Sequence, residues 1–200
     1  MLKGRLVNLR PMLVEDIPIL EKWFIEHPLA VSMIGSRLSS IESVKKYFEN
    51  GLKDSFNRRD FIIESASEKK PIGAISLEEV NWIDRRAEAV IFLGERKYRR
   101  REYVFDTYII MFNYAFNYLN LNRVQWHMAE FNAGIFETLN QWVKETLDES
   151  DPIVFKMEGI QEEAIYYNGK YWNVHLYGIR KNSYNMVKDK FLRHFIEKYC

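Results

Sequence analysis

The sequence decides its fold at residues 86–104, which read Arg86-Ala-Glu-Ala-Val-Ile-Phe-Leu-Gly-Glu-Arg-Lys-Tyr-Arg-Arg-Arg-Glu-Tyr-Val104. The apolar run 90–93 ends at Gly94 and predicts a buried strand over 86–93. From Val104 to Leu119, apolar residues recur three or four positions apart and predict a long helix. Because the first N–H groups of a helix have no partner within it, the basic loop between the two elements is either an anion site or a solvated turn.

The composition limits the classes of protein that the chain can belong to. Two hundred residues suffice for one domain with its own core, and a net charge of +1 argues against bulk attraction to nucleic acid or to an anionic membrane. No apolar run reaches the ~18 residues of a membrane helix. The one cysteine, Cys200, cannot form an internal disulfide, and the four histidines are far apart. We therefore expect a cytoplasmic protein with no metal, no nucleic acid and no membrane partner.

The remaining chain alternates strand and helix patterns. Asp16 stands at the N-cap of a first helix with Ile17, Leu20, Trp23 and Phe24 inward, and a loop is expected over 28–38. Ser39 or Ser40 caps a second helix, which turns Val44, Tyr47, Phe48 and Leu52 inward. Further strands are predicted at 4–9, 60–64, 72–80 and 122–130.

The C-terminal third carries the clearest turn signal. Asn168-Gly169 lies between aromatic and β-branched runs, a pattern typical of a β-hairpin. A helix that begins after Phe131-Asn132 precedes this hairpin. Its predicted inward face consists of Ile135, Phe136, Leu139, Trp142 and Val143, and an acidic connector over 145–153 follows it. The chain closes with an amphipathic helix over 184–199.

This order of elements indicates an α/β (α+β) fold. The long helix between the strands 86–93 and 122–130 fits a crossover that leaves them parallel, whereas the short connectors fit antiparallel neighbours. We expect a mixed, mostly antiparallel sheet with helices on both faces and a C-terminal helical extension. The predicted boundaries are 1–182 for the domain and 183–200 for the extension.

With these elements in this order, the chain resembles the GNAT superfamily of N-acyltransferases, and within it the Rim-type branch. The resemblance covers about residues 1–182 and rests on the following motifs: Gly4-Arg-Leu-Val-Asn-Leu-Arg-Pro, Ile72-Gly-Ala-Ile, Ala87-Glu88, Phe92-Leu93-Gly94, Tyr114-Ala-Phe, Leu119-Asn-Leu-Asn-Arg-Val, Phe131-Asn132, Glu158-Gly159, Asn168-Gly169 and Leu176-Tyr-Gly-Ile. Each motif is weak alone, and the ordered set is specific for the fold.

The resemblance implies that acetyl-CoA is the co-substrate. Its pantetheine would follow the strand around Ile91, Phe92 and Leu93, and its pyrophosphate would lie at the loop and helix start over 99–104. The residues that the resemblance places there are Arg99, Arg100, Arg101, Glu102, Tyr103 and Val104. Asn132 is either a simple helix N-cap or a residue that helps to hold the cofactor, and in this fold it could be both.

The pyrophosphate loop of this chain departs from the family pattern, Arg/Gln-x-x-Gly-x-Gly/Ala. Glu102 and Val104 stand where the small residues belong, so the loop is degenerate and holds no glycine. Glycine loss removes close backbone approach, for which the arginines could compensate by binding phosphate with side chains. The three arginines are therefore either a phosphate clamp or a solvated basic run.

N-acylation needs a group that removes a proton from the amine and a proton for the departing thiolate. Glu88 is the candidate general base, with a salt-bridged strand glutamate as its other interpretation. Glu78 and Glu79 lie on the neighbouring strand, and one of them should face the acceptor. The family tyrosine that protonates the thiolate falls near Leu139, so Tyr98 and Tyr103 are the alternative donors; His127 is interpreted as a packed or surface residue.

Two functions remain open on the sequence. The first is acetyl transfer from acetyl-CoA to a primary amine by direct attack, with a small molecule or a peptide as acceptor. The second is a catalytically weak or inactive GNAT-like module that binds or regulates. In this fold the acceptor pocket would be built by residues 27–40 and the hairpin near 168, and the chain is expected to be a monomer or a homodimer.

Overall fold

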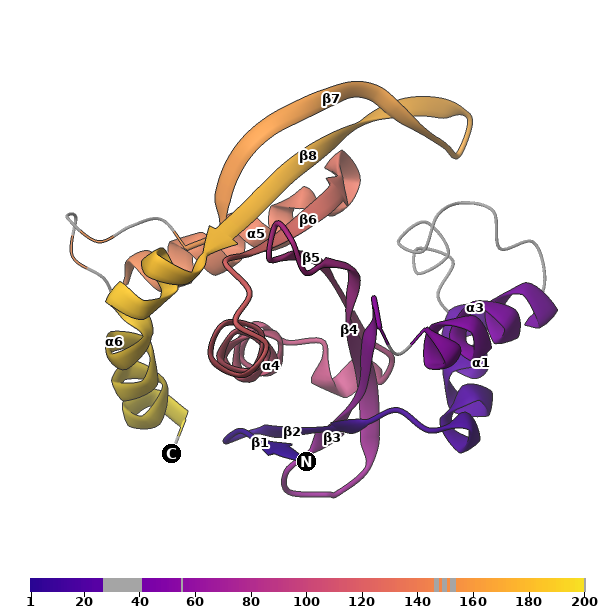
Figure 1. Ribbon diagram of the computed structural model, residues 1–200, viewed down its shortest axis with the longest axis horizontal. Helices are drawn as coiled ribbons and strands as arrows, with labels where there is room; N and C mark the ends of the chain where they lie inside the picture. The colour runs from indigo at the N-terminus through magenta and orange to yellow at the C-terminus, as the bar shows by residue number, and fades with distance from the viewer. Residues whose placement is uncertain (27–40, 55, 146–147, 149–150, 152–153, 200) are drawn as a thin grey trace. The chain divides into compact units, whose positions relative to one another are not determined.

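The structure is a computed structural model that describes residues 1–26, 41–54, 56–145, 148, 151 and 154–199 (Figure 1). The chain divides into two compact units. Unit 1 comprises Met1–Asn81 and Ala87–Met111, and unit 2 comprises Trp82–Arg86 and Phe112–Cys200. The predicted loop over 28–38 and the predicted caps Ser39 and Ser40 lie outside the described residues.

The strands of unit 1 follow one another in chain order. They are β1 (Leu2–Lys3), β2 (Val7–Pro11), β3 (Arg59–Ser65), β4 (Pro71–Asn81) and β5 (Arg86–Leu93), in the sheet order β1-β2-β3-β4-β5. The pairings β1–β2, β2–β3 and β3–β4 are antiparallel, with Leu9 opposite Ile63 and Ile63 opposite Gly73. The strands predicted at 60–64, 72–80 and 86–93 are confirmed.

The first predicted strand, 4–9, is wrong in its limits. Gly4 lies between β1 and β2, where its N–H donates to the Val7 carbonyl at 2.8 Å. The buried carboxylate of Asp106 then accepts the backbone N–H groups of Arg5, Leu6 and Val7 at 2.9, 2.7 and 2.9 Å. The Asp106 side chain therefore satisfies the backbone N–H donors around the start of β2. The alternation of polar and apolar residues over 4–9 does not indicate this contact.

Two helices of unit 1 pack side by side on its core (Figure 1). They are α1 (Ile17–Glu26), preceded by the 3₁₀ turn η1 (Val14–Asp16), and α3 (Ile41–Lys53). Their inward faces are those predicted, with these residues buried: Ile17, Leu20, Trp23, Phe24, Val44 and Phe48. The 3₁₀ turn η2 (Arg96–Tyr98) and the helix α4 (Arg101–Asn113) follow β5, which confirms the predicted strand, loop and helix.

The prediction that Asp16 caps α1 is wrong in its detail. Asp16 ends η1, and its carboxylate accepts the N–H of Leu13 at 2.8 Å and the guanidinium of Arg10 at 2.6 and 2.7 Å. Arg10 also binds Glu64 of β3 at 2.7 Å. The carboxylate therefore closes the turn before the helix and ties it to the sheet.

Unit 2 contains the C-terminal half of the chain. Its elements are the π-helical turn η3 (Tyr114–Tyr118), β6 (Arg123–Ala129), α5 (Glu130–Lys144), β7 (Lys156–Tyr167), β8 (Lys170–Arg180) and α6 (Lys181–Tyr199). The strand order is β6-β8-β7, and both pairings are antiparallel. The predicted hairpin is confirmed, with positive φ at Asn168 (50°) and Gly169 (84°), as its turn requires.

The core of unit 2 is aromatic. Trp126, Phe136 and Phe155 lie with ring centroids 5.2–5.6 Å apart, and Tyr177 lies 4.6 Å from Phe136. Ile135, predicted to face inward, is 40% exposed, because the buried stripe of α5 runs instead through Ala133, Phe136, Leu139 and Val143. The predicted mixed α/β fold with mostly antiparallel strands is confirmed.

Gly73 is a position where a side chain cannot be accommodated. A Cβ at Gly73 would overlap the carbonyl oxygen of Phe92 on β5, whereas a Cβ at Gly134 of α5 would meet no atom within 4 Å. We predict that Gly73→Ala lowers the free energy of unfolding by about 1–3 kcal/mol through overpacking. Gly134→Ala, the control, should raise it by about 0.5–1 kcal/mol because alanine favours a helix. Urea unfolding measures both, and equal effects would contradict the close approach.

Asp16 should make the stability depend on acid pH. Burial raises the pKa of its carboxyl, but the hydrogen bonds from Arg10 and from the N–H of Leu13 outweigh burial, so the pKa is lowered in the folded chain. A lowered folded pKa gives stability that is fully present above the unfolded value of about 3.9 and is lost as the pH falls below it. Asp16→Asn should therefore lower the free energy of unfolding at neutral pH, and this difference should shrink as the pH falls through about 4.

The exposed pair Lys22–Glu26, with side chains 62% and 51% exposed, provides the control for Asp16. Glu26→Gln should leave the free energy of unfolding nearly unchanged, because exposed ion pairs contribute little. Urea unfolding at a series of pH values measures both variants. A pH dependence that is the same in the wild type and in Asp16→Asn would contradict the assignment.

Candidate functional site

A pocket lies on the face of the unit 1 sheet that α1 and α3 cover. Ala74 and Ser76 of β4 and Val90 and Phe92 of β5 form its floor, because residues two apart on a strand share a face. Asp60 of β3 and Ile75 of β4 also line the pocket. The other lining residues come from the segments before β3 and η1 and from the two helices: Met12, Phe24, Tyr47, Phe48 and Arg58. The pocket is thus largely apolar, with a polar cluster in its wall.

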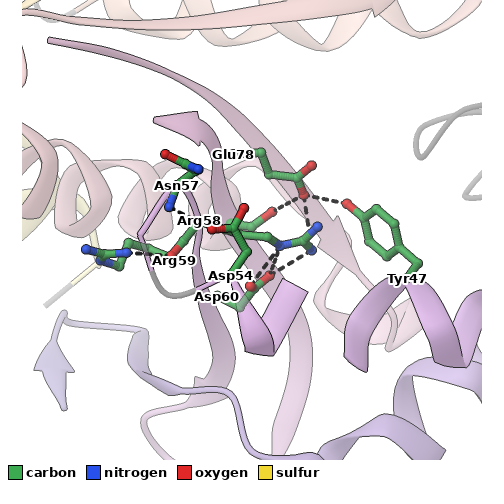
Figure 2. Close-up of polar contacts among 8 residues, drawn as sticks. Tyr47, Asp54, Asn57, Arg58, Arg59, Asp60 and Glu78 are labelled. Carbon is green, nitrogen blue, oxygen red and sulfur yellow. Dashed lines mark hydrogen bonds and ion pairs between the residues drawn. The ribbon is translucent and has the colours of Figure 1, made fainter. Parts of the chain in front are cut away.

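The polar cluster is organised by the guanidinium of Arg58 (Figure 2). Its Nε donates to both carboxylate oxygens of Asp60 at 3.0 and 2.8 Å, and its Nη2 lies 2.9 Å from Asp60 Oδ1 and 3.2 Å from Glu78 Oε1. The same oxygen of Glu78 accepts the hydroxyls of Tyr47 at 2.5 Å and Ser76 at 2.7 Å. One cation therefore holds two carboxylates, which leaves the cluster with one net negative charge.

Packing against α3 holds the Arg58 side chain in place. Its Cζ lies 4.3 Å from the centre of the Tyr47 ring, a cation–π contact. A Cβ at Gly51 would lie 2.6 Å from Arg58 Nε and 2.7 Å from Cζ, so α3 and the Arg58 side chain are in close contact at this position. The turn before β3 fixes the backbone, since the N–H of Arg58 donates to the Asp54 carbonyl at 3.1 Å.

Burial and the neighbouring charges shift the pKa of the groups in the cluster. Burial raises the pKa of Asp60, although the hydrogen bonds from Arg58 act against this rise. Burial and then the charge of Glu78 raise the pKa of Tyr47, so its hydroxyl stays protonated and donates to Glu78. Burial lowers the pKa of Arg58, but the bond to Asp60 and the charges around it give a net rise, so Arg58 remains a cation.

Glu88 lies on the strand face that lines the pocket. It is half-buried and stands two residues before Val90, which together with Phe92 forms the floor. Of the two neighbouring glutamates, Glu78 belongs to the polar cluster, whereas Glu79 is exposed and has a φ of 49°. The role of Glu88 as the general base stays a prediction.

The basic loop uses two of its arginines internally. Arg99 donates from Nε to the carbonyl of Leu93 at 2.9 Å and from Nη2 to that of Gly94 at 2.6 Å, so it binds the end of β5. Arg100 Nη2 lies 2.6 Å from Glu102 Oε1; the Arg100 side chain is 67% exposed and that of Glu102 is 8% exposed. Arg101 is exposed at the first position of α4.

The start of α4 offers free backbone donors. The N–H groups of Tyr103 and Val104 both donate to the Arg100 carbonyl, at 3.1 and 3.4 Å. Within the described part of the chain, those of Arg101 and Glu102 have no acceptor. Two free N–H groups at a helix N-terminus, next to exposed arginines, have the chemistry that a phosphate group requires. The loop residues therefore fit a CoA pyrophosphate, with Glu102 as the one opposing charge.

The loop is anchored to α1. Trp23 Nε1 donates to Glu95 Oε1 at 2.9 Å, and a Cβ at Gly94 would overlap the Trp23 ring. The N–H groups of Gly94 and Glu95 both donate to the Ile72 carbonyl of β4. The strand end and the loop are consequently set by contacts from two other elements.

The other predicted site residues lie as follows. Ile91 and Leu93 are buried on the face of β5 opposite the pocket floor, and the rings of Tyr98 and Tyr103 meet edge to face at 5.0 Å. Asn132, in unit 2, is not the helix N-cap: α5 begins at Glu130 after the N-cap Ala129, so Asn132 lies inside the first turn. His127 is exposed on β6, as expected.

Reasoning from the sequence missed Tyr47, Arg58 and Asp60 as site residues. Arg58 and Asp60 are two apart at the start of a strand, and opposite charges at that spacing share a face. This pattern could have indicated the pair. The link to Tyr47 and Glu78 has no signal in the sequence, because it joins a helix to a strand that lies 31 residues further along.

The part of the chain that the structure describes has neither a group of metal ligands nor a membrane-spanning helix. Among its residues, no three His, Cys, Asp or Glu side chains gather as metal ligands. In that same part of the chain, no helix combines the length and apolarity needed to cross a membrane.

Comparison with known proteins was made for families, curated proteins and solved structures. The model of a family described as acetyltransferase (GNAT) domain matches residues 6–141. No curated protein matches the chain. A chimera of the spermidine N-acetyltransferase SpeG from Vibrio cholerae with hSSAT matches at 22% identity over 90% of this chain and 99% of that chain, with a TM-score of 0.73.

Two further Vibrio cholerae structures share the fold. Spermidine N-acetyltransferase in complex with CoA and spermine matches at 22% identity over 90% of this chain and 98% of that one, with a TM-score of 0.71. A dodecameric form in an intermediate state matches at 21% identity over 89% and 95%, with a TM-score of 0.67. At these identities the likeness establishes the fold.

Tyr47→Phe tests the polar cluster. The variant keeps the ring over Arg58 but removes the hydroxyl that donates to Glu78. We expect the free energy of unfolding to fall by about 1–2 kcal/mol, because Glu78 loses one donor in a half-buried site. Tyr166→Phe on the exposed hairpin, where the side chain is 58% exposed, should change it by less than about 0.5 kcal/mol. Equal urea midpoints for both variants would contradict the hydrogen bond.

Proposed function

We propose a substrate class and a set of residue roles for this chain, which belongs to the GNAT acetyltransferase family over residues 6–141. As a member of that family it transfers an acetyl group to an amine, and GNAT acetyltransferases take that group from acetyl-CoA. The proposal is that the acceptor is an aliphatic primary amine with more than one cationic group. Its chain would lie in the apolar pocket of unit 1.

The observation that carries this proposal is the charge of the pocket wall. Asp60 and Glu78 give two carboxylates against the single guanidinium of Arg58, next to walls made of Phe24, Phe48 and Phe92. An anionic acceptor would be repelled by the net negative charge, whereas an ammonium group would be attracted. The aliphatic part of such an amine would remain in contact with the aromatic side chains. Structures that share the fold are named spermidine N-acetyltransferases, which supports this class.

Glu88 is proposed as the general base. It lies on the same face of β5 as Val90 and Phe92, so a proton leaving an amine in the pocket can reach its carboxylate directly or through a water. Acetyl-CoA, when bound, supplies the activated acetyl group for direct attack by the neutral amine. As the N–C bond forms, Glu88 accepts the amine proton. The C–S bond breaks and the thiolate of CoA leaves and takes up a proton, for which Tyr98 and Tyr103 are the predicted donors. The Arg58 cluster holds the rest of the acceptor.

The loop over 99–104 is proposed to hold the CoA phosphates. The free N–H groups of Arg101 and Glu102 and the exposed Arg101 side chain support this role. Ile91, Phe92, Leu93, Tyr103 and Val104 would shape the rest of the cofactor site. The contribution predicted for Asn132, the assignment to the Rim-type branch, the boundaries 1–182 and 183–200, the cytoplasmic location and the monomer or homodimer remain proposals.

An acetylation assay tests the acceptor class. Purified protein is given acetyl-CoA with spermidine, with a monoamine of similar length, or with a peptide that has a free N-terminus, and products are identified by mass spectrometry. We expect spermidine to be acetylated with the highest kcat/KM. Preference for the peptide would instead support the Rim-type branch. Absence of CoA binding by calorimetry would contradict the enzyme and favour the binding module.

Two variants separate the proposed roles. Glu78→Gln should raise KM for spermidine about ten-fold and leave KM for acetyl-CoA unchanged, since it removes one charge near the ammonium.

Glu88→Gln should lower kcat most at pH values below the pKa of the amine, where a base is needed. Glu79→Gln, an exposed neighbour, is the control for both. Full activity of Glu88→Gln at low pH would remove Glu88 as the base.

A further inference from the structure

The ion pair at the start of α4 has an unusual distribution of burial. Glu102 is 6% exposed and occupies the second position of the helix, where the family loop has a glycine, whereas the side chain of its partner Arg100 is 67% exposed. The buried member is therefore the anion, and it lies beside the two N–H groups that have no acceptor in the described structure. A helix N-terminus favours a negative charge, and here the chain supplies one itself.

We propose that Glu102 acts as an internal anion that weakens the binding of CoA, and that Arg100 offsets it. This rests on the proposed function, because it assigns the CoA phosphates to the same helix start. A pyrophosphate held at this helix start would bring further negative charge close to the Glu102 carboxylate. The two anions repel each other, and the low exposure of Glu102 limits the screening of this repulsion by salt.

Arg100 determines how strong the repulsion is. Its Nη2 is bonded to Glu102 at 2.6 Å, while its exposed guanidinium has further N–H donors that can face a phosphate. The pair is thus neutral without the cofactor and can bind the cofactor through Arg100 when it is present. Arg99 has fewer N–H donors for a phosphate than Arg100, because its Nε and Nη2 donate to the carbonyls of Leu93 and Gly94.

The Arg100–Glu102 pair would give a loop without glycines an anion site whose strength depends on two side-chain charges. In the family pattern the backbone alone surrounds the phosphates, so affinity depends on glycine conformations. In this chain it depends on the balance between one buried carboxylate and one surface guanidinium. Changing either charge should therefore alter the affinity in opposite directions.

The test measures the affinity of CoA by isothermal titration calorimetry for four proteins. Compared with the wild type, Glu102→Gln should bind CoA roughly ten-fold more tightly, as expected for removing one charge at several ångströms in a partly screened site. Arg100→Gln should bind about ten-fold more weakly. The double variant should return to within about three-fold of the wild type, because the two charges cancel.

Glu42→Gln provides the matched control. Glu42 is also the second residue of a helix, α3, and is exposed. The Glu42→Gln variant loses the same charge as Glu102→Gln but outside the loop, so its affinity for CoA should equal that of the wild type. Thermal unfolding of each variant shows that affinities are compared between folded proteins.

The outcomes distinguish this inference from the proposed function. Binding of CoA by the wild type with unchanged or weaker binding by Glu102→Gln overturns the role of Glu102 and leaves the acetyltransferase proposal intact. Detectable binding by Glu102→Gln but not by the wild type supports the inference strongly. Absence of binding by all folded variants overturns both.

Discussion

The arrangement of unit 1 around its pocket depends on the guanidinium of Arg58. It is enclosed by Gly51 on α3 and by the Tyr47 ring, and it binds Asp60 and Glu78 from two adjacent strands. Buried carboxylates without a partner are costly, so α3, β3 and β4 must meet where this single cation can satisfy both. The same balance leaves the pocket wall with one net negative charge, on which the proposed cationic acceptor depends.

The end of β5 and the loop that follows it obey a different constraint, which is steric. Gly73 and Gly94 have no side chain because the Phe92 carbonyl and the Trp23 ring occupy that space. Arg99 then bonds to the carbonyls at the end of β5, which fixes the approach to α4. The Arg100–Glu102 pair lies at the start of that helix. A strand, a ring, an arginine bound to backbone carbonyls and one ion pair thus position the residues that are proposed to hold the cofactor.

Much of the fold was predictable because its signals are local. The strand 86–93, the hairpin at Asn168-Gly169 and the apolar stripe of α1 each follow from spacing within a few residues. The errors arose where a distant group decided the geometry. The Asp106 carboxylate of α4 binds the N–H groups that precede and begin β2, so this strand starts at Val7 and not at residue 4. The helix α5 starts before Asn132 because β6 runs directly into it.

For the site, the sequence by itself determined the basic loop, the missing glycines and the family to which the chain is similar, since these depend on residue identity and order. Glu88 also followed from its position on a strand. Only the tertiary structure brought Tyr47, Arg58, Asp60 and Glu78 together, and only it showed that Glu102 is buried while Arg100 is exposed. Burial and pairing between elements depend on packing, and packing determines which charges a ligand meets.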